Sequence, residues 1–582
     1  MHSNSLINGG ILLKKYMTRI AEQVSEIYPA VSVKDLIQWL EIPPKEEMGD
    51  ITLPCFRLSK MLRQSPQHIA EQLKDLLQLD FIDRKETTAG YLNMYLNKES
   101  LGFEVVSEIL SHRDQYGAST VGHGKKVVID FSSPNIAKPF HIAHLRSTVI
   151  GHALYRIYSF QGYRCIGINH LGDWGTQFGK LITAYRLWGN AEAVEQGGID
   201  ELLRLYVAFH DEAETQPDLE DDARRWFAKM EQGDQEALQL WKWFVEISLR
   251  EFNRIYTLLG VDFDSYAGES FYNDQMGAII EELKVKGLLE EDDGAWLVRI
   301  DEYQLPPALI VKQDGSSLYH TRDITAAMYR KKEYDFDKAI YVTDYAQNLH
   351  FQQWFKIIER MGYDWANKLE HVAFGRVRLE GKSLSTRKGN VLKLEDVLDQ
   401  AISKVKSIIE SRNPGLRNKN EVARAVGVGA IIFHDLSMSR IKDIDFSWED
   451  ALQFEGETGP YVQYAHARAT TVLKKAERTF GVPEAGNTVV PKYLTDEASA
   501  RLVKELSEFG DVIEKAAEKL EPSIVSRYLI DLAQQFNRFY HECPILVPDQ
   551  QIRETRLALV ECVQITLKNG LWLIGVEAPE EI

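Results

Sequence analysis

The sequence lacks several features that would mark a specialised class of protein. It has only four cysteines in 582 residues, and no two of them form a CxxC pair. This pattern argues against a disulfide framework or a zinc finger and favours a reducing compartment, which we expect to be the cytoplasm. No apolar run reaches the ~18 residues that a membrane span requires. The N-terminus also lacks the charged, apolar and small-residue regions of a signal peptide, so we expect no membrane contact.

Positive charge is scarce as well. Lys and Arg number 68 against 86 Asp and Glu, which gives a formal net charge of −18. Because a protein neutralises nucleic-acid phosphates with clustered Lys and Arg, this balance argues mildly against such a partner. Net charge does not describe local patches, however. Any prediction of RNA binding must therefore depend on motifs.

The chain is long enough for several domains. At ~150 residues per domain, its length suggests three or four. Residues 1–118 combine an amphipathic helical stretch at 69–79 with mixed segments, and a Gly-rich polar linker follows at 114–126. We predict an N-terminal α+β domain over 1–118, a catalytic domain over 119–392, a helical connection over 393–445 and a helical domain over 446–582.

The second of these regions has the pattern of an α/β fold. Short apolar runs alternate with helical stretches, at 127–131, 165–168, 308–311, 338–344 and 371–377. Such alternation predicts parallel βαβ units in a doubly wound, Rossmann-like sheet. The acidic stretch 190–250 is predicted to be a helical insertion. From 393 onward almost every segment is amphipathic and helical, which predicts an all-α bundle.

The first stretch with candidate functional residues is SSPNIAKPFHIAH (132–144). Here a buried strand passes through a loop into a helix. Helix N-termini above such sheets commonly bind phosphate. His141 and His144 are three residues apart, so they face one side of the helix. They can donate hydrogen bonds to phosphate oxygens, and Lys138 adds a charge beside them. The alternatives are a chance HxxH pair or half of a metal site, although no further ligand cluster accompanies it.

This stretch resembles the first signature of class I aminoacyl-tRNA synthetases, in the form found in the arginyl branch. The next segment, NHLGDWGTQFG (169–179), is similar to a segment of the arginyl enzymes. The resemblance implies ATP contacts for Gly172 and Asp173, together with His141 and His144. Taken alone, the glycines of this segment would indicate only a tight turn.

A counterpart of the second class I signature lies at GKSLSTRKGN (381–390). It resembles the Met-Ser-Thr-Arg-Lys-Gly variant of the arginyl branch. The resemblance implies catalytic roles for Ser385, Arg387 and Lys388, with Lys388 also binding ATP, because cationic and hydroxyl donors can clamp the phosphates in the transition state. Without the first signature upstream, a solvated basic loop would be the preferred interpretation.

Specificity is expected between the two signatures. A guanidinium is planar and always charged, so a bidentate carboxylate binds it best, and Asp323 is the first candidate. The resemblance adds Tyr319 and Gln347 to this pocket and assigns the α-amino and carboxylate end of arginine to Ser133 and Asn135. Glu269 is a candidate second acid. The alternative for Asp323 is a helix N-terminal carboxylate stabilised by the dipole.

The C-terminal bundle and the N-terminal domain are the expected contacts with tRNA. Tyr461, Tyr464 and Arg468 fall on one helical face, and such side chains suit the unstacked bases of an anticodon loop. Core packing is the alternative. The segment around 49–54 resembles the added domain that meets the tRNA elbow. The implied partners are ATP with Mg²⁺, L-arginine and tRNA(Arg), with no structural metal and with a monomeric chain.

Three positions depart from the family pattern. Ala143 replaces the usual Gly of the first signature, and Thr386 replaces the second lysine of the second signature. Arginyl enzymes with that loss typically carry a lysine before the first signature, as Lys138 does here. The ending at 578–582 lacks the usual basic or Met residues, so we assign it no tRNA contact. The remaining rivals are a synthetase for another amino acid and an inactive paralogue that binds tRNA.

Overall fold

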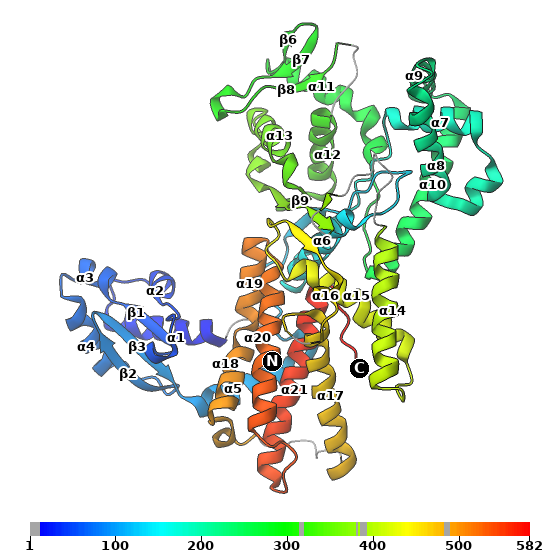
Figure 1. Cartoon of the computed structure of the whole chain (residues 1–582). Helices are drawn as coiled ribbons and strands as arrows, with labels where there is room; N and C mark the ends of the chain where they lie inside the picture. The colour runs from blue at the N-terminus through cyan, green and yellow to red at the C-terminus, as the bar shows by residue number, and fades with distance from the viewer. Residues whose placement is uncertain (1–11, 314–318, 380–381, 384–392, 455, 482–488) are drawn as a thin grey trace, which may run out of the picture.

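The structure is a computed structural model that describes residues 12–313, 319–379, 382–383, 393–454, 456–481 and 489–582. Figure 1 shows a small N-terminal unit on the left, a parallel sheet at the centre, two lobes above the sheet and a helical bundle below it. The sheet therefore lies where all the other parts except the N-terminal unit converge. No described helix is long and apolar enough to cross a membrane.

The N-terminal unit is a three-stranded antiparallel sheet with helices packed on it, in the strand order β1-β3-β2. Its elements are α1 (Leu12–Ile27), α2 (Val33–Trp39), η1 (Glu46–Met48), β1 (Ile51–Pro54), α3 (Phe56–Leu62), α4 (Pro66–Leu76), β2 (Ile82–Thr88) and β3 (Tyr91–Leu96). Ser65 caps α4 by accepting a hydrogen bond from the backbone of His68, and Pro66 follows it at the first helical position. A capping serine followed by a proline is a common start of a helix.

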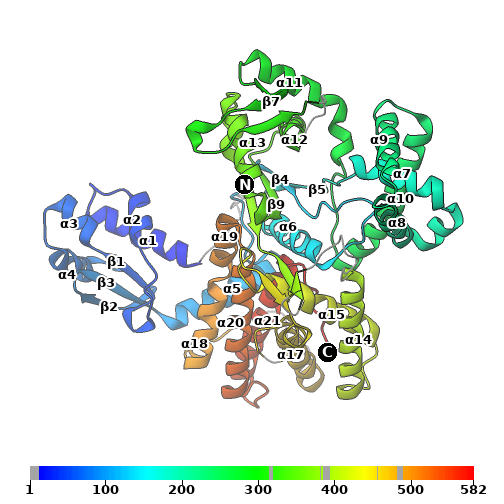
Figure 2. The same ribbon diagram turned by 45° about the horizontal axis from the view of Figure 1, so that its top comes forward.

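Helix α5 (Lys98–His112) belongs to the N-terminal segment in sequence but packs on the C-terminal bundle. Gly102 lies so close to Leu494 that a Cβ atom there would be 3.0 Å from it. Cys562 Sγ approaches the carbonyl of Val106 at 3.8 Å, and η2 (Arg113–Gln115) continues the same contact. The segment 1–118 thus divides in its packing near residue 97, and Figures 1 and 2 both show the part before that residue at one side of the bundle.

The central sheet has four parallel strands in the order β10-β9-β4-β5. These are β4 (Lys126–Asp130), β5 (Arg164–Ile168), β9 (Lys338–Asp344) and β10 (Leu369–Phe374). Val127 and Ile129 pack in the core that includes helix α6 (Ile142–Phe160). Val128 packs on the opposite face with α12 (Tyr319–Tyr334) and α13 (Asn348–Arg360). Both faces are covered, which confirms the predicted doubly wound fold.

Two lobes interrupt this sheet. The first comprises α7 (Thr176–Trp188), α8 (Ala191–Ala213), α9 (Asp218–Glu231) and α10 (Gln235–Leu259), so the helical unit is wider than the stretch 190–250. The second contains η3 (Glu269–Gln275), α11 (Met276–Val285), β6 (Glu290–Asp292), β7 (Ala295–Val298), η4 (Asp301–Tyr303) and β8 (Ala308–Val311). Figure 2 shows the two lobes on separate sides of the central strands.

The placement of 308–311 in the parallel sheet was wrong. This segment is β8, and it pairs antiparallel with β7 in a separate sheet of order β6-β7-β8. A short buried apolar run shows that a strand forms but does not reveal its partner. The stretch 371–377 is likewise divided, because β10 ends at Phe374 and a different strand begins at Val377.

The rest of the chain is almost entirely helical. A small sheet of order β12-β11-β13 joins the central sheet to the helices, through β11 (Val377–Leu379), β12 (Lys382–Ser383) and β13 (Ile444–Phe446). The helices are α14 (Leu394–Arg412), α15 (Lys419–Leu436), α16 (Trp448–Ala451), α17 (Gly459–Phe480), η8 (Pro491–Leu494), α18 (Glu497–Ser507), α19 (Phe509–Lys519), α20 (Ser523–Glu542) and α21 (Gln550–Leu573). The remaining short helices are η5 (Tyr345–Gln347) and η6 (Asp364–Lys368). The predicted all-α bundle is therefore present.

Candidate active site and nucleic-acid interface

The loop of the first signature has an unusual backbone. Ser132, Ser133 and Ala137 have φ values of 71°, 47° and 60°, in the left-handed region that non-glycine residues rarely adopt. Each such residue costs on the order of 1–3 kcal/mol and is common at functional sites. Ser132 Oγ lies within hydrogen-bond distance of Thr148 Oγ1 (2.8 Å) and Tyr256 Oη (2.7 Å). These contacts hold the loop in its strained form above β4.

The two histidines of the first signature stack on each other at the start of α6. Their ring centroids are 3.7 Å apart, and His144 Nδ1 accepts a hydrogen bond from the backbone N–H of His141 at 3.2 Å. Burial, with the charge of Lys138 as a second cause, lowers the pKa of His141 to about 4. Burial also lowers the pKa of His144, well below its ordinary value. Both rings are therefore neutral at pH 7, so a contact with phosphate would depend on hydrogen bonds and not on their charge.

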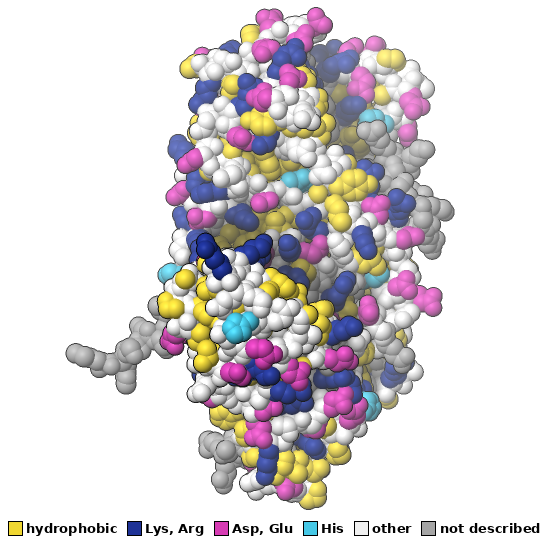
Figure 3. Space-filling view, turned by 90° about the vertical axis from the view of Figure 1, so that its left-hand side faces the viewer, with side chains coloured by type: hydrophobic (Ala, Val, Ile, Leu, Met, Phe, Trp, Pro, Cys, Tyr) yellow, Lys and Arg dark blue, Asp and Glu magenta, His cyan; other side chains and the backbone are white. Residues whose placement is uncertain are grey.

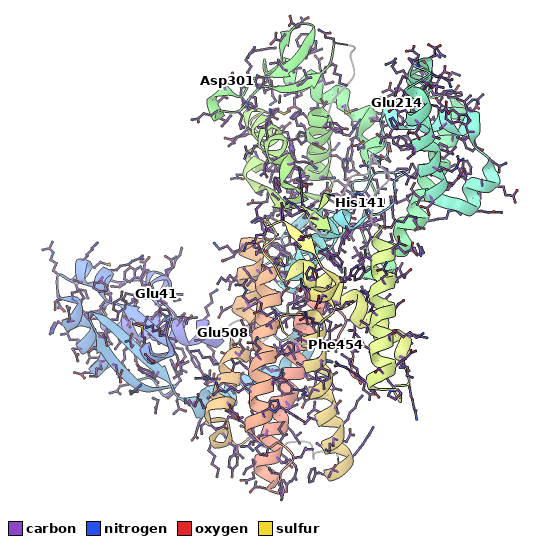
Figure 4. The ribbon with its side chains drawn as sticks, in the orientation of Figure 1. Glu41, His141, Glu214, Asp301, Phe454 and Glu508 are labelled. Atoms are coloured by element: carbon purple, nitrogen blue, oxygen red, sulfur yellow. The ribbon has the colours of Figure 1, made fainter. Side chains whose placement is uncertain are left out.

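Figure 4 labels His141 at the level of the parallel sheet, below the two lobes. Lys138 lies close enough to both histidines to lower their pKa values. Its Nζ atom lies 5.8 Å from the centre of the Tyr206 ring, which belongs to α8. The side chain is half-buried. Lys138 is thus placed beside the histidines, between the first signature and the helical lobe.

A cavity of about 1190 Å³ opens above the carboxyl ends of the central strands. This central cavity gathers eight of the predicted site residues from separate parts of the chain, namely Ser133, Asn135, His144, Gly172, Glu269, Tyr319, Asp323 and Gln347. Ala143 also lines it. Gly172 fits against Asn135 so tightly that a Cβ atom would lie 2.1 Å from Asn135 Oδ1, which explains the need for glycine there.

Of the residues predicted for the ATP and arginine sites that the structure describes, three lie outside the lining of the central cavity. His141 stacks on His144, and Lys138 belongs to the first-signature loop itself. The Asp173 carboxylate faces the segment at Ser270, where it accepts hydrogen bonds from the backbone N–H at 2.8 Å and from Oγ at 2.6 Å. In this structure Asp173 therefore fixes the segment that carries Glu269. The predicted residues Ser385, Arg387 and Lys388 lie outside the described part of the chain.

Two acids on the cavity wall already have partners. Glu269 lies 3.3 Å from a guanidinium nitrogen of Arg322, and burial raises the pKa of its carboxyl to about 7 despite that charge. Asp323 Oδ2 is 2.5 Å from His350 Nε2. Burial raises the pKa of Asp323, but the hydrogen bond from His350 and the nearby positive charges outweigh it, and the net pKa lies below the ordinary value. Asp323 is therefore the more firmly ionised of the two.

The floor of the cavity carries residues that sequence reasoning missed. Arg330, only 1% exposed in its side chain, pairs with Asp130 at 2.8 Å. Asp130 in turn accepts a hydrogen bond from Ser133 Oγ at 2.9 Å. Arg330 lies seven residues after Asp323, two helical turns along the same face of α12, so the spacing carried a signal. His350 lies three residues after Gln347, and this spacing was a weaker signal that it belongs to the site.

The described residues contain no group of three His, Cys, Asp or Glu side chains that could hold a metal ion. The four cysteines are free and buried. Among the described residues, the two histidines of the first signature are therefore not joined by further side chains that could bind a metal ion with them. The expectation of no structural metal stays a prediction.

The predicted tRNA residues form a joint surface with α20. Arg468 on α17 lies 4.9 Å from the ring centre of Tyr464 and 5.3 Å from that of Tyr540. Asn537 accepts a hydrogen bond from Arg468 and donates one to Tyr461 Oη at 2.8 Å. Tyr464 and Tyr540 are 41% and 39% exposed. An arginine between two exposed rings is a surface that unstacked bases can use, and Tyr540 and Asn537 were not found from the sequence.

The N-terminal segment at 49–54 lies next to the bundle. Asp50 Oδ1 is 3.3 Å from Lys504 Nζ of α18. Figure 3 shows the side of the molecule that includes this unit, where basic and acidic side chains are interspersed. The net charge of −18 thus leaves Lys and Arg distributed over this face.

Comparison with known proteins agrees with this architecture. Residues 105–448 match a family described as tRNA synthetases class I (R), catalytic domain. Residues 462–582 match the DALR anticodon binding domain, and residues 14–96 match the arginyl tRNA synthetase N terminal domain.

Individual relatives cover nearly the whole chain. The chain is 52% identical to an arginine–tRNA ligase of Alkaliphilus metalliredigens, over 98% of this chain and 100% of that protein. It is also 52% identical to that of Clostridioides difficile, with the same coverage. The chain is 27% identical to the solved arginyl-tRNA synthetase of Thermus thermophilus, with a TM-score of 0.83. The match covers 98% of this chain and 100% of that structure.

Proposed function

The chain belongs to the arginyl-tRNA synthetases, the class I arginine–tRNA ligases, and from this premise we propose which of its residues serve each substrate. The enzyme activates L-arginine with ATP and transfers the arginyl group to the 3′-terminal ribose of its tRNA. In the first step a carboxylate oxygen of arginine attacks the α-phosphorus and pyrophosphate leaves. In the second step a ribose hydroxyl attacks the carbonyl carbon and AMP leaves.

The arginine side chain is proposed to bind between Asp323 and Glu269. Two carboxylates on one cavity wall suit a guanidinium, and the lowered pKa of Asp323 keeps that group ionised. Tyr319 and Gln347, both exposed at the cavity, supply further hydrogen bonds. Ser133 and Asn135, on the first-signature loop, are proposed to hold the α-amino and carboxylate end.

The phosphates of ATP are proposed to lie over the N-terminus of α6. His144 lines the cavity there, and His141 supports it by stacking. Gly172 is proposed to let ATP approach the backbone closely. Asp173, which also holds the Glu269 segment, is proposed as the second ATP contact of the same loop. Ser385, Arg387 and Lys388 remain proposed phosphate contacts on the basis of the sequence alone, and Lys138 is proposed to add the charge that Thr386 lacks.

Mg²⁺ is proposed to enter with ATP and to be held mainly by its phosphates. Among the described residues no cluster of three ligand side chains is available to hold it independently. The ion would neutralise charge on the leaving pyrophosphate. The protein's own residues orient the two substrates and stabilise the transition state by charge and hydrogen bonding.

The anticodon of tRNA(Arg) is proposed to bind at the surface formed by Tyr461, Tyr464 and Arg468, with Tyr540 and Asn537 beside them. The N-terminal unit is proposed to contact the elbow. One chain carries both the substrate cavity and this surface, which supports a monomeric working unit. Four free, buried cysteines support a reducing place of action, the cytoplasm.

The observation that carries this assignment is the single cavity that joins the first signature to Asp323 and Glu269. The test is ATP–pyrophosphate exchange that depends on arginine, measured with tRNA present, on the natural chain and on Asp323→Asn. We expect exchange with arginine alone among the amino acids. The substitution should raise the KM for arginine by ~30-fold or more, since a buried cation loses its charge partner. An unchanged KM would remove Asp323 from the pocket.

A further inference from the structure

The cavity contains a histidine to which the proposed function gives no task. His350, in the first turn of α13, lines the same cavity as Asp323. Its Nε2 atom is 2.5 Å from Asp323 Oδ2. The two side chains are 21% and 27% exposed, so they meet at the cavity wall and not deep in the core. The pair joins two helices, α12 and α13, across the site.

The His350 ring is itself positioned by contacts with neighbouring side chains. Its centroid lies 4.4 Å from that of His320 on α12. His320 Nε2 is 3.1 Å from Gln353 Oε1, and Gln353 donates through Nε2 to the carbonyl of Pro306 at 2.9 Å. This series of contacts fixes the ring before any substrate arrives. The orientation of the histidine is therefore a property of the fold.

The Asp323 carboxylate depends on this histidine for its orientation. Among the described residues, the hydrogen bond from His350 is the only one made to that carboxylate. The guanidinium of Arg330, whose charge helps to lower the pKa of Asp323, is already paired with Asp130 at 2.8 Å. The torsion that rotates a carboxylate about its last bond is broad, so without a hydrogen bond its plane is poorly defined.

Orientation matters more for a guanidinium than for an ammonium group. A guanidinium donates two parallel hydrogen bonds in one plane and needs both carboxylate oxygens correctly placed. An ammonium group is a compact charge with three rotatable donors and tolerates a carboxylate in many orientations. Fixing the carboxylate plane therefore favours arginine over lysine without any added contact to the substrate.

We propose that His350 is a positioning residue for arginine selection, which holds Asp323 Oδ2 through Nε2–H and so sets the carboxylate plane for a guanidinium. The inference rests on the proposed binding of arginine by Asp323. It adds a residue whose effect on specificity passes through another side chain.

The test compares two substitutions in the full chain with tRNA present. In His350→Gln the amide nitrogen can take the place of Nε2, whereas His350→Leu removes the donor and keeps the bulk. We expect His350→Leu to raise the KM for arginine by ~10-fold, because one hydrogen bond to a charged group is lost. The KM for ATP should change less than ~2-fold. His350→Gln should return the arginine KM to within about 3-fold of the natural value.

Competitive inhibitors then test the selection itself. Agmatine carries a guanidinium and L-lysine carries an ammonium group. Inhibition by agmatine should weaken in His350→Leu by about the same factor as the arginine KM, while inhibition by L-lysine should change less than ~2-fold. Equal weakening of both inhibitors would overturn the role of the carboxylate plane.

A matched control is His371→Leu. The His371 ring stacks on that of Phe351 with centroids 4.2 Å apart, and its Nε2 atom is 2.7 Å from Thr343 Oγ1. It makes no hydrogen bond to Asp323 among the described residues. It should leave the arginine KM unchanged, which separates positioning from general loss of packing. If His350→Leu does not fold, the smaller polar His350→Asn provides the same comparison, because its shorter amide does not reach Asp323.

Each failure has its own meaning. If Asp323→Asn leaves the arginine KM unchanged, the pocket assignment itself is wrong. If Asp323→Asn raises it but His350→Leu does not, only the positioning role is overturned. The same conclusion follows if His350→Gln is no better than His350→Leu, or if the KM values for arginine and ATP rise together.

Discussion

The backbone of His141 pairs with that of Lys393 in an antiparallel bridge. The next residue, Leu394, donates its N–H to the carbonyl of Phe140 at 2.9 Å. Lys393 also contacts Asp200 of α8 through Nζ at 2.6 Å. Lys393, three residues after the end of the second signature, is therefore fixed both to the first signature and to the helical lobe. The first signature and the start of α14, more than 200 positions apart in the sequence, therefore meet.

Lys138→Ala should slow adenylate formation. Thr386 carries no charge, so Lys138 is the proposed substitute for a cation on the leaving pyrophosphate. A charge directed at developing negative charge is worth ~3–4 kcal/mol, so kcat should fall by ~100-fold or more while the arginine KM changes little. ATP–pyrophosphate exchange measures both.

Two further variants sharpen that result. Thr386→Lys in the Lys138→Ala background should recover part of the rate, because both positions would serve one phosphate. Lys125→Ala, an exposed lysine at the other end of β4, should have no effect. Near-normal exchange by Lys138→Ala would instead assign the charge to Arg387 or Lys388.

Arginine binding should release a proton near neutral pH. Burial raises the pKa of Glu269 to about 7 in the free enzyme, with Arg322, Asp323 and Asp173 as the charged groups around it. A bound guanidinium favours the ionised carboxyl, so the arginine KM should fall as the pH rises from about 6 to about 8. Steady-state kinetics across this range, with calorimetry in buffers of different ionisation enthalpy, measures the effect. Glu269→Gln should abolish this component, and an unaltered profile in that variant would assign the proton to another group.

Tyr464→Ala should weaken tRNA binding and leave the fold intact. Tyr464 is 41% exposed and lies over Arg468, so little packing is lost. Stacking of one base is worth ~1–3 kcal/mol, which predicts a rise of ~10-fold or more in the KM for tRNA. The matched control is Tyr303→Ala, in the lobe above the sheet. The centre of the Tyr303 ring lies 4.7 Å from Lys356 Nζ. A lower melting temperature without a change in tRNA KM would support core packing for Tyr464.

Asp435→Ala should destabilise the junction of the sheet and the bundle. Arg146 of α6 is fully buried and lies 3.4 Å from Asp435 of α15, and it donates to the carbonyls of Gly375 and Lys442. Removing one partner of a buried pair leaves an uncompensated charge and typically costs ~3–5 kcal/mol. The midpoint of thermal unfolding measures the loss. Arg424→Ala, which breaks a more exposed pair with Glu577, should shift it far less, and equal shifts would contradict the prediction.

Much of the fold could be predicted from the sequence because its signals are local. The strands β4, β5 and β9 follow from short apolar runs, and α4 and α6 follow from their starts at Ser65 and His141. The antiparallel sheet of the second lobe was missed, although Asp293-Gly294 joins β6 and β7. Both residues have positive φ, and an Asp-Gly pair between two strands is a strong hairpin signal.

The site was less accessible to sequence reasoning because its contacts connect distant elements. Residue types and motif order indicated Asp323 and Glu269, since carboxylates suit a guanidinium. They did not reveal that Arg322 pairs with Glu269 or that His350 fixes Asp323, because these pairings depend on how η3, α12 and α13 meet. The ATP contact that its segment suggested for Asp173 stays a prediction. The sequence did not reveal that its carboxylate also accepts hydrogen bonds from Ser270.

The packing of α5 on the bundle determines where the protein can be dissected. A shortened chain that begins at residue 97 keeps the helix that covers Leu494 and Cys562. One that begins at residue 119 removes that helix and leaves part of the bundle's apolar surface in water, at about 25 cal/mol for each Å² exposed. The first fragment should remain monodisperse and charge tRNA slowly, whereas the second should aggregate. The natural point of division thus lies before α5 and not at the Gly-rich linker that follows it.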